Sequence, residues 1–143
     1  MRDILFKAKR LDNGEWMEGY YVRYGFTEQE KCYIMPYYAS ALYSTEIDPS
    51  TVCQYTGLTD KNERKIWEND IVKRNFRLYS SETKYEEREN KGIVKYDSGF
   101  ARFGYQCSVF SMLGRSKKHD TLEVIGNIFD TPELLEAIYD KRK

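Results

Sequence analysis

The sequence predicts a mainly β protein with a single short helix at its C-terminus. Apolar and polar residues alternate in many short segments, and this period of two is typical of half-buried strands. Turn-forming Gly, Asn, Asp and Pro residues separate the segments. The 143 residues include 13 tyrosines and are 15% aromatic, and aromatic side chains favour strands.

The first third of the chain predicts a β hairpin. Ile4, Phe6 and Ala8 alternate with lysines, which indicates a strand with one buried face. The turn Asp12-Asn13-Gly14 follows, and Asn and Gly tolerate the positive φ that tight hairpin turns require. The aromatic and β-branched segment 16–24 is the expected return strand. Further strands are expected at 32–38 and 52–55.

The second half predicts more strands and then the helix. Strands are expected at 92–96, 100–103 and 122–129. Segment 79–91 has almost no core-forming residues, so we interpret it as an inserted loop or an extended hairpin that reaches a neighbour. Thr131 is the expected N-cap of the final helix, with Pro132 at its first position. The apolar stripe that identifies this helix consists of Leu134, Leu135, Ile138 and Tyr139.

Composition limits the class of protein. The length suits one compact domain or two tightly joined subdomains. The 23 basic and 23 acidic residues cancel, whereas proteins that depend on phosphate contacts usually carry a basic excess. Any nucleic-acid surface must therefore be local.

Three features predict a cytoplasmic protein with no membrane partner. The N-terminus lacks the apolar run of a signal peptide. No window approaches the length of a membrane-spanning helix. The odd set Cys32, Cys53 and Cys107 contains no CxxC pair, so we expect thiols in a reducing compartment.

Two long segments carry a family resemblance. Segment 54–72 begins QYTGLTDKN and ends IWENDIV, and segment 123–135 reads EVIGNIFDTPELL. Both are similar to the signature segments of the YopX family of phage and prophage proteins, and the opening Ile4–Ala8 also fits. The chain departs from the family pattern at Glu63 and Asn69, where the family often has Gly. Both positions lie in expected turns with positive φ, which Asn tolerates better than Glu.

The resemblance implies a fold and a genetic setting but no catalytic residues. It implies a small SH3-like β-barrel, encoded by phages, prophages or related mobile elements. On this basis residues 1–143 are expected to form a single YopX-like domain. Its parts would be an N-terminal β-hairpin subdomain at 1–54, the barrel at 55–130 and the short C-terminal helix at 131–143.

The chemistry-bearing residues predict neither an enzyme nor a cofactor. The one histidine, His119, lies in a basic loop, and the cysteines lack metal-ligand spacing. No nucleophile elbow, phosphate loop or dinucleotide fingerprint occurs. Asp70 is expected to bond backbone amides in its turn, and the Gly57 and Gly126 segments are interpreted as bends of the barrel. We therefore expect no catalytic residues, no metal and no cofactor.

Two basic patches are the candidate nucleic-acid contacts, and aromatic residues lie near both in sequence, as in stacking surfaces of small β-barrels. The six candidates are Lys73, Arg74, Arg77, Arg115, Lys117 and Lys118. Neighbouring glutamates would repel phosphate.

The leading functional hypothesis is therefore a non-enzymatic phage or prophage accessory protein of unassigned activity. It would form a homo-oligomer and bind or regulate a host or phage protein. A nucleic-acid-binding β-barrel module is the alternative.

Overall fold

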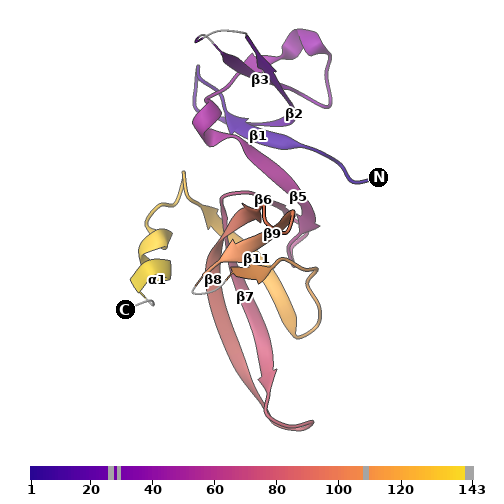
Figure 1. The fold of residues 1–143 in the computed structure, drawn as a ribbon, viewed down its shortest axis with the longest axis vertical. Coiled ribbons are helices and arrows are strands. Elements are labelled where there is room, and N and C mark those ends of the chain that lie inside the picture. The colour runs from indigo at the N-terminus through magenta and orange to yellow at the C-terminus, as the bar shows by residue number, and fades with distance from the viewer. Residues whose placement is uncertain (26–27, 29, 108–109, 141–143) are drawn as a thin grey trace. The chain divides into compact units, whose positions relative to one another are not determined.

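A computed structural model of the chain describes residues 1–25, 28, 30–107 and 110–140. These residues form two compact units, Met1–Gly57 and Leu58–Lys143 (Figure 1). Both units are built from antiparallel strands, so the predicted mainly β class is confirmed. Among the described residues, no helix has the length and apolar character needed to cross a membrane.

The first unit contains the predicted N-terminal hairpin. Its strands are β1 (Phe6–Lys9), β2 (Trp16–Tyr24), β3 (Lys31–Met35), β4 (Thr45–Glu46) and β5 (Cys53–Thr59). They are the first five strands of a six-stranded sheet with the order β4-β3-β2-β1-β5-β6. Two 3-10 turns, η1 (Ala41–Tyr43) and η2 (Pro49–Thr51), connect the later strands. β1 pairs with β2 from Phe6↔Gly19 to Lys9↔Trp16. One face of this sheet is buried around Ala8, Ile34 and Ile47.

The second unit contains a five-stranded sheet and the only α-helix found among the described residues. Its elements are β6 (Lys65–Trp67), β7 (Asp70–Tyr79), β8 (Tyr85–Asp97), β9 (Arg102–Gln106), β10 (Phe110–Met112), β11 (Asp120–Asn127) and α1 (Leu134–Asp140). The sheet order is β10-β9-β8-β7-β11. Of the two interpretations of segment 79–91, the extended hairpin is the one observed, because β7 and β8 pair without interruption from Ile71↔Ile93 to Tyr79↔Tyr85 on either side of the turn at 80–84. They form the long hairpin in Figure 1.

The SH3-like barrel is not confirmed. Within the described residues, the two sheets have open ends and neither closes on itself.

Two hydrophobic clusters lie on opposite faces of the second sheet, because successive residues of a strand point to opposite sides. Val72 belongs to the larger cluster, together with Ile66, Val94, Tyr105, Leu122 and Val124. Its neighbour Ile71 packs instead with Ile93 and with Ile138 of α1. The helix therefore covers the Ile71 face, and the other face is filled from β6, β9 and β11.

Asp60 joins the two family-like segments. Its side chain is 5% exposed, and one carboxylate oxygen accepts the N–H groups of Asn62 (2.8 Å) and Arg64 (3.0 Å). The other oxygen accepts the N–H of Val124 in β11 at 2.9 Å. Glu63, inside this turn, adopts φ +62° although it is not Gly, and its N–H donates to the Asp60 carbonyl at 3.0 Å. Asp60 therefore connects the turn at residues 60–64 to Val124 of β11, which lies 64 residues later in the sequence.

The second family-like segment forms a close corner. A Cβ at Gly126 would collide with the Thr131 side chain, so only glycine fits there. The Thr131 hydroxyl accepts the N–H of Asn127 and donates to its carbonyl, both at 2.9 Å. Because that hydroxyl holds the corner, Thr131 does not cap the helix as predicted, and α1 begins at Leu134.

Two smaller predictions from the sequence are confirmed. Asp70 is 2% exposed and accepts the N–H of Trp67 at 2.8 Å, while Asn69 between them adopts φ +68°. Cys32, Cys53 and Cys107, all within the described residues, form no disulfide.

Asp60→Asn is expected to destabilise the second unit by about 2 kcal/mol. The amide offers one acceptor instead of two, and its NH2 group would face the Val124 N–H, leaving a buried donor without an acceptor. Urea unfolding followed by the fluorescence of Trp67 in a Trp16→Phe background measures the effect.

Asp97→Asn is the matched control, because one oxygen of Asp97 accepts a single turn N–H, that of Gly99 at 3.0 Å, and the other oxygen lies 3.8 Å from Arg102 Nε, beyond hydrogen-bond distance. That variant should change stability by less than about 0.5 kcal/mol. Equal losses in the two variants would contradict the role assigned to Asp60.

Candidate nucleic-acid interface

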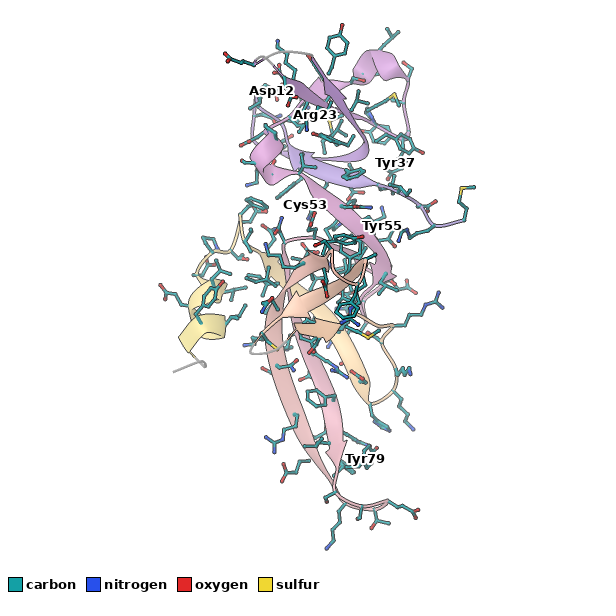
Figure 2. All side chains as sticks on the ribbon, in the orientation of Figure 1. Asp12, Arg23, Tyr37, Cys53, Tyr55 and Tyr79 are labelled. Atoms are coloured by element: carbon teal, nitrogen blue, oxygen red, sulfur yellow. The ribbon has the colours of Figure 1, made fainter. Side chains whose placement is uncertain are left out.

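A cavity of about 370 Å³ lies beside the outer edge of β7 in the second unit. We call it the basic pocket; it is lined by Arg74, Phe76, Arg77, Tyr79, Lys117, Lys118, His119 and Asp120. Figure 2 shows Tyr79 on the long hairpin, close to its tip. The pocket therefore brings together cations from two segments about forty residues apart, with two aromatic rings between them.

The register of β11 against β7 creates this pocket. The two strands pair from Asn127↔Asp70 to Asp120↔Phe76, where β11 begins. Just before this point the Lys117 N–H donates to the Asp120 carbonyl at 2.8 Å, which folds residues 117–120 into a tight turn. β7 continues past Phe76 to Tyr79, so the turn lies beside its edge.

The Arg74–Asp120 ion pair forms the inner wall of the pocket. Arg74 Nε and Nη2 each lie 2.7 Å from an Asp120 carboxylate oxygen, and the guanidinium is 4.6 Å from the centre of the Phe76 ring. Nη1 also reaches the Tyr105 hydroxyl at 3.4 Å, and this hydroxyl donates to Asn90 at 3.1 Å. The hydrogen bonds from Arg74 lower the pKa of Asp120, and the bond to Asp120 raises the pKa of Arg74. Arg74 is therefore held in place by its own partners.

Arg77 is also already paired. Its Nε donates to Glu87 at 2.8 Å, which raises the pKa of Arg77, and its guanidinium stacks 4.0 Å from the centre of the Tyr85 ring. Tyr85 in turn lies 5.6 Å, centre to centre, from Tyr79. Tyr79, which lines the pocket, therefore has an aromatic neighbour on the paired strand β8.

Lys117 and Lys118 are the cations most available to a ligand. Both are exposed, and neither forms a salt bridge with a carboxylate among the described residues. Lys117 contributes to the lowered pKa of Asp120 after Arg74. An anion bound here would therefore meet two solvated ammonium groups beside a guanidinium that is already neutralised.

The remaining two sequence candidates lie elsewhere. Arg115 lines a second cavity, of about 200 Å³, which shares Arg74 and Asp120 with the basic pocket. Lys73 does not line either cavity, and it points to the face of β7 opposite Arg74. Arg77 and Tyr79 point to the same face as Lys73, but they lie at the end of β7 where β11 no longer pairs with it, and there they reach the basic pocket. The ammonium of Lys73 lies 3.5 Å from Glu123, which also pairs with Lys61 at 3.1 Å. The six candidates are thus divided into four in the pocket, one beside it and one on the other face.

The structure adds His119 and Asp120 to the site. From the sequence, His119 was considered only for metal binding and as a catalytic base, and Asp120 was not a candidate for the site. The alternation of β7 could have separated Lys73 from Arg74 if the strand had been recognised as extending to Tyr79.

Arg74→Lys is expected to raise the pKa of Asp120 toward its ordinary value. Lysine keeps the charge but loses the two parallel hydrogen bonds, which are the largest cause of the lowered pKa. NMR titration of the Asp120 side-chain carboxyl measures this change. The pair stabilises the fold above the ordinary pKa of Asp and loses this effect as pH falls through the lowered pKa. As pH falls, the free energy of unfolding of the variant should therefore begin to decrease at a higher pH than that of the unmodified protein. An unchanged Asp120 titration would contradict the pairing.

Comparisons with known proteins identify the family. The family model described as YopX protein matches residues 5–136. The crystal structure of protein EF1440 from Enterococcus faecalis is similar, with 23% identity, a TM-score of 0.47, and coverage of 95% of this chain and 100% of that chain. No curated protein matches the chain. Because the family model spans nearly the whole sequence, the chain belongs to the YopX family.

Proposed function

We propose that this protein is a non-enzymatic, cytoplasmic accessory protein of phages and prophages that binds single-stranded nucleic acid at the basic pocket. The convergence of Lys117 and Lys118 with Phe76 and Tyr79 around one cavity carries the proposal. The phage setting is carried over from the family resemblance.

The chemistry of the pocket suits a single strand better than a duplex. Exposed ammonium groups neutralise phosphates, and aromatic faces stack on bases that are not enclosed in a double helix. Tyr79 is 54% exposed and contacts the ring of Tyr85 at a tilt of 53°, so an accessible ring remains for stacking. A strand running along β7 would reach the lysines with its backbone and Tyr79 with a base.

The charges of the hairpin limit the strength of this binding. Arg74 and Arg77 are paired with Asp120 and Glu87, and the net charge of the chain is zero. The electrostatic attraction therefore comes mainly from Lys117 and Lys118. We expect weak binding with a small salt dependence, in contrast to a strongly basic DNA-binding domain.

A relationship of the second unit to SH3-like barrels is part of the proposal. The order β10-β9-β8-β7-β11 is a four-stranded meander whose fifth strand returns to pair with the first. This order is that of SH3-type barrels and supports the relationship, although closure of the barrel is not seen among the described residues. We also propose that residues 1–143 act as a single domain of the family.

The double variant Lys117→Gln/Lys118→Gln is expected to reduce the salt dependence of single-strand binding. Each phosphate contact on a single strand contributes about 0.7 to the slope of log K against log salt, so the slope should flatten by about 1.4. Tyr79→Ala should weaken binding by about 1–3 kcal/mol per stacked base without changing the slope. Fluorescence anisotropy with labelled single-stranded DNA and RNA over a salt series measures both effects.

Lys73→Gln is the matched control. It removes one lysine from the same strand as Arg74, but the structure places that lysine on the other face, paired with Glu123. The slope of log K against log salt for this variant should equal that of the unmodified protein. If no salt-sensitive binding occurs at micromolar protein, the nucleic-acid proposal is wrong and a host or phage protein becomes the expected partner.

A further inference from the structure

The smaller cavity of the second unit adjoins the basic pocket but has different walls. This cavity of about 200 Å³, which we call the side cavity, shares only Arg74 and Asp120 with the basic pocket. Pockets for drug-sized ligands begin at about 300 Å³, so the side cavity suits a smaller group. Its other lining residues come from β10, from β11 and from the segment that joins these strands: Met112, Leu113, Gly114, Arg115 and Leu122.

The segment that carries Arg115 is fastened on both sides. The Ser116 hydroxyl accepts the N–H of Leu122 at 3.0 Å and donates to the carbonyl of the same residue at 3.4 Å. On the other side, Met112 of β10 pairs with Gly104 of β9. Leu113 packs on the larger hydrophobic cluster, to which Leu122 belongs. The wall and floor of the side cavity are therefore in place before any ligand arrives.

Arg115 is the cation of the side cavity whose donors are available to a ligand. It is exposed, and within the part of the chain that the structure describes it forms no salt bridge. The guanidinium of Arg74, in contrast, is held by Asp120 through two hydrogen bonds of 2.7 Å. A guanidinium is a planar fork of N–H donors without an acceptor, so it selects a ligand with two acceptors side by side.

Among the nucleobases, guanine fits this fork and the apolar lining best. Its O6 and N7 are neighbouring acceptors, and an arginine bound to both is the commonest base-specific contact of proteins. Adenine carries an amino group in place of O6. Cytosine also has two neighbouring acceptors, O2 and N3, but its single ring covers less of an apolar wall. Met112 is 64% exposed, and a thioether sulfur makes favourable contacts with aromatic rings.

We propose that the side cavity is a guanine subsite of the single-strand site, in which Arg115 binds O6 and N7 and Met112 contacts the base. This inference rests on the proposed function, because the lysines that hold the strand, Lys117 and Lys118, follow Arg115 by two and three residues. Asp120 lines both cavities, so one strand reaches both. A strand held by its phosphates at the lysines thereby gains a base preference at one position.

Competition between strands that differ at one base tests this preference. The probe is a labelled single-stranded oligothymidylate, and each unlabelled competitor carries a single central guanine, adenine or cytosine. The guanine strand should bind about tenfold more tightly than each of the others, the discrimination expected of one bidentate base contact. Because all strands have the same phosphates, the ratio of two affinities reports the base alone.

Arg115→Gln should move the preference from guanine to adenine. The glutamine amide offers one donor and one acceptor, which match N6 and N7 of adenine. Lys118→Gln is the matched control, because it removes one cation from the basic pocket and none from the side cavity. This control should weaken the binding of every strand and leave the ratio of guanine to adenine affinities unchanged.

Gly114→Leu tests the cavity without changing its charge. A Cβ at Gly114 meets no atom within 4 Å, so the variant should fold with an unchanged melting temperature. Its side chain should occupy space in the side cavity and abolish the guanine preference, while oligothymidylate still binds with an unchanged salt slope.

The outcomes separate this inference from the proposed function. Salt-sensitive binding with equal affinity for all strands, or with a preference for cytosine, would overturn the guanine subsite and leave the proposed function standing. A uniform loss of affinity in Arg115→Gln together with a flatter salt slope would make Arg115 a phosphate contact, and the subsite would again be wrong. If no strand binds, the proposed function fails and the subsite is rejected with it.

Discussion

The second unit depends on the buried carboxylate of Asp60. Its two oxygens accept three backbone N–H groups, two from its own turn and one from Val124. A buried carboxylate is costly unless all its acceptor positions are used, so the turn and β11 can only form together. Once β11 is held by this contact and by its pairing with β7, Val124 and Leu122 complete the larger cluster, and the chain reaches the Gly126 corner in position to place α1.

This dependence explains what the two family-like segments do. The first supplies Asp60, Asn69 and Asp70, and the second supplies Val124, Gly126 and Asn127. Each of these residues makes a backbone contact or a close approach that shapes the second unit. None of them lines the basic pocket, which is built from β7 and from residues 117–120. The segments that define the family are therefore architectural, and the proposed binding surface lies outside them.

Local patterns in the sequence predicted the strand content, the N-terminal hairpin, the apolar stripe of α1 and the role of Asp70 correctly, because each depends on neighbours a few residues apart. Contacts across long stretches of chain were not predictable. Asp60 meets Val124 across 64 residues, and Arg74 meets Asp120 across 46, with no periodicity to indicate either.

The basic patches illustrate the same limit. From the sequence alone, Lys73 and Arg74 were predicted to belong to one basic patch. In the structure they point to opposite faces of β7, where Lys73 pairs with Glu123 and Arg74 pairs with Asp120. Segments 73–77 and 115–118 were predicted to form two separate patches. The pairing of β11 with β7 instead brings four of their six basic residues to one pocket. Thr131 was a reasonable cap by type, but its hydroxyl is used by Asn127.

The most direct test of the separation between architecture and binding is an amide chemical-shift map of the labelled protein titrated with a short single-stranded oligonucleotide. The account predicts that the shifts cluster on residues 74–79 and 115–120, while the amides of Tyr55–Thr59 and Ile125–Asn127 stay nearly unchanged. Shifts concentrated on those two family-like segments, with the basic pocket silent, would contradict it.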